Sequence, residues 1–210
     1  MRAYLTEAIG TFFLVFTICL TVVQGTPFAP LAIGAALMIM VYMGGHISGG
    51  HYNPAVTLAA VLRGALPSNR LGGYWVCQLL GSVLAAYVAC LVTGQKFAPA
   101  PGTGVTSRSA LAVEFLFTFA LCLVVLNVAT SQKTEGNSYY GLAIGFTIVV
   151  AAFAGGGLSG GAFNPAVGTG PTIIAALSGG PGWGNLWLYW VGPLLGGVVA
   201  AMVFRFQEGE

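Results

Sequence analysis

Long apolar stretches, separated by short polar connections, make up most of the 210-residue sequence. A helix needs roughly 20 residues to cross the hydrocarbon core of a bilayer, which is about 30 Å thick. We expect six spanning helices, near residues 3–23, 30–48, 70–92, 109–130, 139–155 and 185–206. Two further apolar segments, near 53–63 and 164–177, are too short to span. We expect each of these to be a re-entrant half-helix.

The same phrase occurs in both halves of the chain. Residues 45–56 read GHISGGHYNPAV and residues 156–167 read GGLSGGAFNPAV, 111 positions apart throughout. Such a match at one fixed offset indicates an internal duplication. Each half has three spans and one short segment in the same order, which predicts repeats at 1–107 and 108–210. Because three is an odd number, the second repeat should enter the membrane upside down, as in inverted-repeat transport proteins.

The composition supports an all-α membrane protein. The chain is 57% hydrophobic and 6% charged, whereas soluble domains carry roughly 25% charged residues. A net charge of +2 gives no basic surface for nucleic acid. The first span begins almost at Met1 with no small-residue cleavage site after it, so we expect a retained helix rather than a signal peptide. The cysteines lack metal or redox spacing, and we expect them to be packing residues: Cys19, Cys77, Cys90 and Cys122.

The basic residues predict an orientation. With the N-terminus in the cytoplasm, only Lys96 and Arg108 fall on the outer side, both flanking the 93–108 loop. Five fall on the cytoplasmic side: Arg2, Arg63, Arg70, Lys133 and Arg205. This bias favours a multi-pass protein with both termini in the cytoplasm, and we expect it in the plasma (inner) membrane.

Each short segment carries a helix-start signal. Asn is a good N-cap and Pro is favoured at the first helical position, so Asn53-Pro54-Ala55 and Asn164-Pro165-Ala166 should begin the half-helices. Gly64 and the run Gly179-Gly180-Pro181 are the expected stops. In inverted repeats the two N-termini can meet near the middle of the membrane. We also expect glycine-rich stretches to form irregular backbone that lines a path: Gly49-Gly50, Gly155 to Gly157 and Gly160-Gly161.

This arrangement predicts a pore. Each half-helix N-terminus carries roughly half a positive charge and free N–H groups, which repel cations. The side-chain amides of Asn53 and Asn164 can donate hydrogen bonds to one passing oxygen. A water held by two donors turns its hydrogens outward, which interrupts the file along which a proton would hop. The sequence shows no nucleophile–base pair and no metal-ligand cluster, so we expect no enzyme activity, no cofactor and no metal site.

The paired motifs resemble those of the aquaporins, the major intrinsic protein family. Further similar stretches are EAIGTF around Glu7, YWVCQLLG at 74–81, VEFLFTF around Glu114 and YWVGPLLGG at 189–197. The resemblance implies six spans plus two half-helices, one pore in each subunit and a homotetramer.

Two acidic residues are expected to support the pore loops. Glu7 and Glu114 are the only carboxylates inside predicted spans, where an acid is costly. The resemblance implies that each accepts hydrogen bonds from the loop of its own repeat and holds the Asn in place. The alternative is a favourable interaction with a helix N-terminus. The resemblance also places His51 in the cytoplasmic half of the pore, and the other predicted lining residues are Gly49, Gly50 and Gly160.

The outer constriction departs from the common family pattern. Most members have Arg directly after the second Asn-Pro-Ala, where this chain has Val167. Family spacing places the other three constriction positions at Ile33, Ala152 and Gly161. These four residues have no side-chain donor, so we expect a wider and more apolar constriction. Val at this position resembles some plant vacuolar-membrane members that are permissive toward small neutral solutes. The alternative is that Val167 is a neutral substitution and leaves water permeation unchanged.

The residues that bear on solute range favour two different classes of solute. Glycerol-conducting relatives usually carry Asp where this chain has Gly168, and Tyr189-Trp190 resembles the aromatic pair of water-selective members. The apolar constriction instead favours ammonia, hydrogen peroxide, urea or glycerol. We therefore predict a passive water channel that also admits small neutral solutes. Two alternatives are a secondary active transporter, which would normally need charged groups near the midplane, and a structural or junction membrane protein.

Overall fold

The computed structural model describes residues 1–180 and 182–209, and in this part of the chain all regular structure is helical. The six long helices are α1 (Arg2–Val23), α2 (Ala29–Ser48), α4 (Leu71–Thr93), α5 (Ser107–Thr130), α6 (Tyr140–Ser159) and α8 (Leu188–Glu208). The two short helices are α3 (Pro54–Arg63) and α7 (Pro165–Leu177). Three single turns of 3₁₀-helix join them: η1 (Ser68–Arg70), η2 (Gln132–Thr134) and η3 (Trp183–Asn185).

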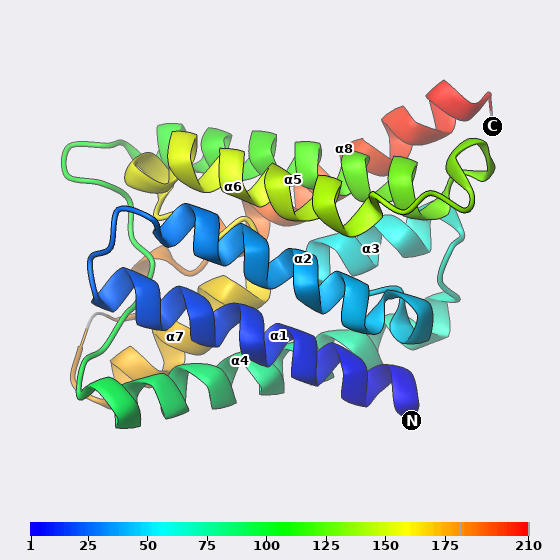
Figure 1. Ribbon diagram of the computed structural model, residues 1–210. Helices are drawn as coiled ribbons and strands as arrows, with labels where there is room; N and C mark the ends of the chain where they lie inside the picture. The colour runs from blue at the N-terminus through cyan, green and yellow to red at the C-terminus, as the bar shows by residue number, and fades with distance from the viewer. Residues whose placement is uncertain (181, 210) are drawn as a thin grey trace.

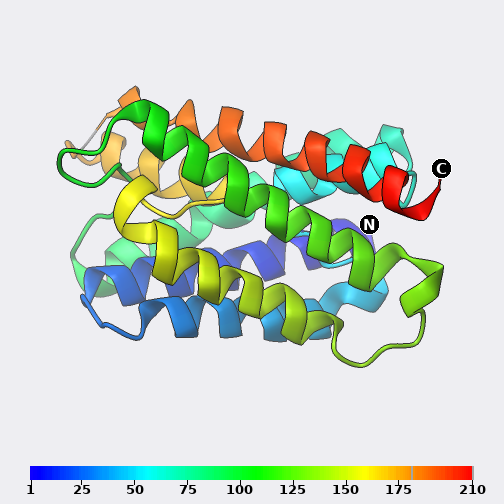
Figure 2. The same ribbon diagram turned by 90° about the horizontal axis from the view of Figure 1, so that it is seen from above.

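The six long helices are long and apolar enough to cross a membrane. The predicted fold class, an all-α membrane protein with six spans and two half-helices, is confirmed. Both termini lie at one end of the molecule, called the terminal end here (Figure 1). The opposite end, called the loop end, carries the α1–α2 turn and the 94–106 connection (Figures 1 and 2). Helix α1 runs toward the loop end, whereas α5 runs away from it.

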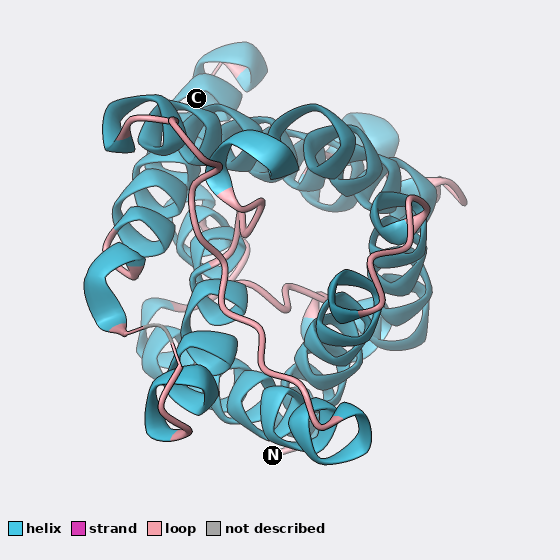
Figure 3. Ribbon diagram, turned by 90° about the vertical axis from the view of Figure 1, so that its left-hand side faces the viewer, coloured by secondary structure: helices cyan, strands magenta, loops and turns pink. Residues whose placement is uncertain are grey.

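The two halves of the chain pack in the same way. Helix α1 packs against α2 and α4, and α5 packs against α6 and α8. The halves then exchange their short helices, because α3 packs against α8 and α7 packs against α4. Seen from the loop end, the helices form a ring, and loops lie inside it (Figure 3). This exchange brings the two Asn-Pro-Ala motifs to the centre.

A glycine pair joins the halves where α2 crosses α6. Gly34 and Gly145 are 111 positions apart, the offset of the repeated phrase. A Cβ atom added at Gly34 would lie 2.5 Å from the carbonyl oxygen of Gly145, and the reverse distance is also 2.5 Å. Side chains at either position would therefore force the two backbones apart. Small residues permit this kind of close approach between membrane helices.

The predicted helix bounds agree with the structure within three residues, except at the end of α6. That helix continues to Ser159, so the prediction of irregular backbone at Gly155 to Gly157 is wrong. Packing explains the difference, because Gly155 lies against α5, where an added Cβ would be 2.7 Å from Val113. Tertiary contact here outweighs the poor helix propensity of glycine. Gly160, with φ of 94°, ends the helix instead.

The short helices end near the predicted stops. Gly64 ends α3 in the left-handed conformation, with φ of 88°. Helix α7 ends at Leu177, and Gly179 follows with φ of 75°. Pro181, the last residue of the predicted second stop, lies outside the described residues.

Candidate functional site

The two motif asparagines cap the half-helices as predicted. Asn53 and Asn164 both have extended backbone, with φ of −155° and −162°. Their Oδ1 atoms accept hydrogen bonds from the amides of Ala55 and Ala166, each at 2.9 Å. A proline follows each cap at the first helical position. The cap therefore fixes the orientation of each side-chain amide.

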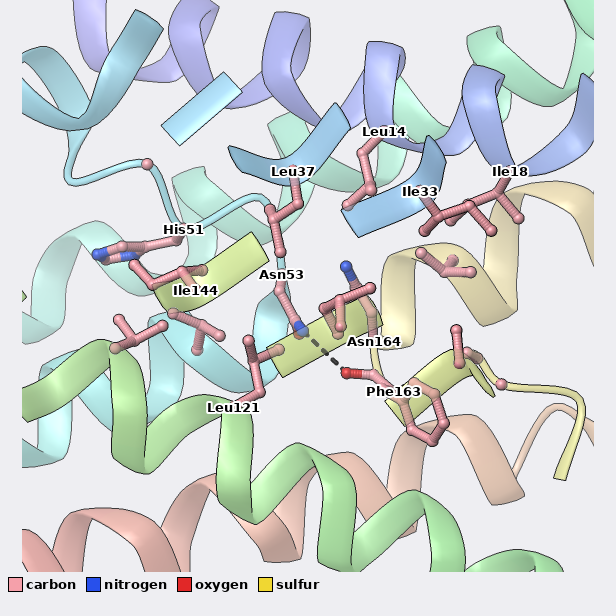
Figure 4. A pocket seen from close by; sticks show the side chains of 18 residues that line it. Leu14, Ile18, Ile33, Leu37, His51, Asn53, Leu121, Ile144, Phe163 and Asn164 are labelled. Atoms are coloured by element: carbon pink, nitrogen blue, oxygen red, sulfur yellow. Dashed lines mark hydrogen bonds between the residues drawn. The ribbon is translucent and has the colours of Figure 1, made fainter. Parts of the chain in front are cut away.

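The Nδ2 group of each asparagine reaches across to the other half of the chain. Asn53 Nδ2 donates to the carbonyl oxygen of Phe163 at 2.9 Å, as Figure 4 shows. Asn164 Nδ2 donates to the carbonyl oxygen of Tyr52, also at 2.9 Å. An amide nitrogen carries two hydrogens, so each Asn has a second N–H available for a solute. The two asparagines are thus tied together at the centre of the molecule.

The two accepting residues have an unusual backbone. Tyr52 and Phe163 each have φ of 50°, which is uncommon for a bulky residue. Both are buried, and their amides donate to carboxyl groups: Tyr52 to Glu7 Oε2 at 2.7 Å, and Phe163 to Glu114 Oε2 at 2.6 Å. These hydrogen bonds fix the residue in the strained conformation that points its carbonyl at the opposite Asn.

The two buried acids have matching partners. Glu7 Oε1 accepts from Ser48 Oγ at 2.6 Å and from the amide of His51 at 3.0 Å. Glu114 Oε1 accepts from Ser159 Oγ at 2.7 Å and from the amide of Ala162 at 3.0 Å. Both acids are 0% exposed. Their carboxyl groups bond the pore loops rather than the beginnings of α1 and α5.

Sequence reasoning missed the serines and tyrosines that complete this support. Tyr74 Oη donates to the carbonyl oxygen of Ser48, and Tyr189 Oη donates to that of Ser159, both at 2.7 Å. A signal was present, because each serine lies in the repeated phrase and each tyrosine begins one of the two similar YWV stretches. The sequence alone does not show that these stretches meet.

A largely apolar cavity runs past the two motifs (Figure 4). The side chains of Asn53, Asn164 and His51 supply polar groups, and Gly50 also lines it. Its apolar wall is formed largely by equivalent residues of the two halves: Leu14 and Leu121, Ile18 and Val125, Ile33 and Ile144, Leu37 and Ile148, Val56 and Val167. The helices therefore place similar apolar side chains on both sides of one path.

The structure brings the four residues of the expected outer constriction to this cavity. Ile33, Ala152, Gly161 and Val167 all line it, and Val167, in the first turn of α7, is 2% exposed. None of their side chains can donate or accept a hydrogen bond. This stretch of the wall offers a solute only apolar side chains and backbone groups.

Two predicted lining residues lie elsewhere. Gly49 lines a separate vestibule of about 550 Å³ near the terminal end, together with Gly45 and His46. Gly160 packs against Ala100, whose carbonyl oxygen would lie 2.7 Å from an added Cβ, and it does not line the central cavity. Both glycines have positive φ and end a spanning helix. Their role in the structure is to turn the chain into the pore loop.

The repeat symmetry is broken around His51. Its Nδ1 lies 3.2 Å from Thr57 Oγ1, which also accepts from Gln78 Nε2 at 2.9 Å. Gln78 Nε2 donates in addition to Glu7 Oε2 at 2.7 Å, so the imidazole is connected to the buried acid. The second half lacks all three side-chain groups, having at the equivalent positions Ala162, Gly168 and Pro193. Apart from the two asparagines, the cavity therefore has a polar side chain, His51, from the first half only.

Comparison with known proteins decides the family. The sequence profile of the major intrinsic protein family matches residues 1–204. The chain belongs to this family. Rat aquaporin-8 is 36% identical over 97% of this chain and 80% of its own length. Aquaporin NIP1-1 of Zea mays is 36% identical over 98% and 74%, and aquaporin TIP1-2 of Musa acuminata is 39% identical over 88% and 72%.

Solved structures agree with this assignment at the level of the fold. The aquaglyceroporin from Plasmodium falciparum superposes with a TM-score of 0.87, at 21% identity over 97% of this chain and 94% of that chain. An FNT family ion channel gives 0.62 at 15% identity, over 99% and 89%. The predicted aquaporin resemblance is confirmed: the protein is a multi-pass integral membrane protein and a passive channel of the aquaporin family.

Proposed function

We propose that each subunit conducts water through the cavity between its half-helices and also admits small neutral solutes. The observation that carries the second part is Val167. It lies at the position where most of the family has Arg, and its side chain lines the cavity with Ile33, Ala152 and Gly161. The solute range follows from the chemistry of this outer constriction.

An Arg at this position would narrow the path, add a fixed positive charge and offer several donors. Val removes the charge and the donors and leaves a smaller side chain. Glycerol, urea, ammonia and hydrogen peroxide are small and carry no charge, so an apolar constriction strips no ionic hydration shell from them. An ion would lose that shell, at a cost of several kcal/mol or more. The constriction is thus permissive toward neutral solutes and remains a barrier to ions.

The centre of the pore orients water. The positive ends of α3 and α7 face the path, and Asn53 and Asn164 each keep one free amide N–H. A water oxygen that accepts from both side chains turns its hydrogens away from the centre. Together with the dipoles, this arrangement excludes protons and other cations without a charged side chain.

The test compares osmotic water flux with glycerol and urea uptake in proteoliposomes, by stopped-flow light scattering. For Val167→Arg we expect glycerol uptake to fall by at least about tenfold, which corresponds to about 1.4 kcal/mol in barrier height, while water flux stays within a few-fold. Val167→Leu is the matched control, because it adds bulk without charge or donors. We expect Leu to reduce glycerol uptake less than Arg does.

Negligible uptake of glycerol and urea by the unmodified channel, beside fast water flux, would refute the second part of the proposal. Absence of all flux from well-folded protein would refute the first part and favour a structural or junction role. Water flux that persists when every ion gradient is collapsed would exclude a coupled transporter.

Orientation and membrane are part of the proposal. The two halves, 1–107 and 108–210, are inverted repeats with both termini in the cytoplasm of a plasma (inner) membrane. The opposite directions of α1 and α5 and the shared terminal end support this (Figure 1), as does the excess of Lys and Arg in the predicted cytoplasmic segments. A fluorescent protein fused to the C-terminus should be protected from external protease in intact cells.

We also propose that four subunits associate, each with its own pore. Large apolar side chains are exposed on the outward faces of α1 and α4, including Phe13, Leu80, Leu84 and Tyr87. Beside them, Gly72 leaves open space that a neighbouring helix can approach. Mass measurement of the protein in detergent should give four chains per particle.

A further inference from the structure

A second, small cavity lies between α1 and α4, near the loop end. It is lined by two thiols, Cys19 of α1 and Cys90 of α4, and by three polar residues that follow or end α4: Thr93, Gln95 and Lys96. Neither cysteine lines the central pore. The cavity measures about 10 Å³, which is room for one water-sized particle rather than an organic molecule.

The two thiols belong to one environment. Helices α1 and α4 pack against each other, and both cysteines line the one cavity between them. Both cysteines are free rather than joined in a disulfide. Cys122 is 0% exposed in the main apolar core and does not line this cavity, whereas Cys19 belongs to the same core and also lines the cavity. The packing interpretation does not account for a pair of sulfurs that share a cavity.

We infer that Cys19 and Cys90 form a binding site for a thiophilic monovalent metal ion, of which Cu(I) is the representative. Thiolate sulfur is a soft ligand that selects Cu(I), and two thiolates suffice for a linear complex of such an ion. Zinc would require four ligands, and the cavity lining has no carboxylate and no imidazole to provide the others. The donor set therefore favours a soft ion of low coordination number.

The remainder of the cavity suits the charge of this complex. On binding, each thiol loses its proton to water at the loop end and forms one S–metal bond, so two protons leave and the site carries one net negative charge. Lys96 lines the same cavity, and its Nζ, which donates to the carbonyl oxygen of Ser178, places a positive charge at the loop end of the site. The other walls are apolar and keep water from the metal: Val23, Ala86, Ala89, Phe97 and Ile174. Metal binding at this site is independent of the solute range proposed above.

The test uses the full chain, purified in detergent, reduced and kept free of oxygen. Cu(I) is added in competition with a coloured Cu(I) chelator, and bound copper per chain is measured. We expect one Cu(I) per unmodified chain, and a loss of affinity of at least about 100-fold in both Cys19→Ser and Cys90→Ser. Lys96→Gln should weaken binding by about tenfold, as expected of a residue outside the ligand pair.

Cys77→Ser is the matched control, because Cys77 is also on α4 and half-buried but does not line this cavity. It should bind Cu(I) as the unmodified chain does. All variants should retain osmotic water flux, which shows that they fold. Failure of the unmodified chain to compete for Cu(I), or equal binding after both cysteine substitutions, would overturn the proposal.

Discussion

At the scale of single residues, the pore depends on two backbone carbonyls that point toward the opposite half. Tyr52 and Phe163 direct these carbonyls from a left-handed conformation that costs of order 1–3 kcal/mol in a bulky residue. The acids Glu7 and Glu114 offset that cost, because they accept hydrogen bonds from the same amides that the conformation turns inward. The acids thus determine the direction of the carbonyls, and the carbonyls, together with the caps, hold the asparagines in one orientation.

This chain of contacts predicts unequal costs for two isosteric substitutions. A Gln at either acid replaces one accepting oxygen by a donor, which leaves a buried amide without a partner at a cost of about 1–3 kcal/mol. We expect Glu7→Gln to destabilise more than Glu114→Gln, because Glu7 Oε2 accepts from Gln78 as well as from Tyr52. Thermal unfolding in detergent measures the difference. The exposed Glu135→Gln is the control and should leave the unfolding temperature unchanged.

Some polar residues of the site could be predicted from the sequence, because they are conspicuous in an apolar stretch. Asn53, Asn164 and the two buried acids are the main examples. The positive φ of Tyr52 and Phe163 could not be predicted, because a tyrosine and a phenylalanine in an apolar run give no sign of backbone strain. That conformation results from hydrogen bonds to an acid more than 40 residues earlier in the chain.

At the scale of helices, tertiary contact decides where glycine is tolerated. The Gly155 to Gly157 run is helical, and of its three glycines only Gly155 packs too tightly against α5 to admit a side chain. Gly49 and Gly160 instead end helices with positive φ. From the sequence alone, all of these glycines look alike. The long apolar stretches predicted where helices occur. They did not predict where α6 ends, because that end depends on packing against α5.

The crossing of α2 and α6 gives a test at this scale. In Gly145→Ala the new methyl group would lie 2.5 Å from the carbonyl oxygen of Gly34 and would push the helices apart. We expect a loss of about 1–3 kcal/mol in the free energy of unfolding. Gly156→Ala, on the same helix, has nothing within 4 Å of the new atom and is the matched control. Equal unfolding temperatures for the two variants would contradict a tight crossing.

At the scale of the whole molecule, the exchange of half-helices makes one cavity from two incomplete halves. Helix α3 lies against α8 and α7 lies against α4, so each half supplies one side of the path. The cavity lining includes no acidic or basic side chain apart from His51. A coupled transporter needs groups that bind its driving ion, and such groups are absent from the described lining of this path. The duplicated phrase predicted this architecture, whereas the partner exchange required the structure.

A passive path predicts flux that depends on the solute gradient alone. Reversing the osmotic gradient across proteoliposomes should reverse water flux at the same magnitude, although His51 makes the two sides of the cavity chemically different. Ionophores that collapse proton and sodium gradients should leave the rate unchanged. A rate that rises with an imposed ion gradient would contradict a channel.

The crossed hydrogen bonds at the centre also have a consequence for how the protein is made. Asn53 bonds to a residue 110 positions later, and Asn164 bonds to one 112 positions earlier. The ribosome delivers the first motif long before its partner, and non-local contacts of this kind form late. The first half-helix is therefore synthesised and held in the membrane before its partner exists. An incomplete chain has no finished water path, so it cannot let water leak across the membrane of the cell.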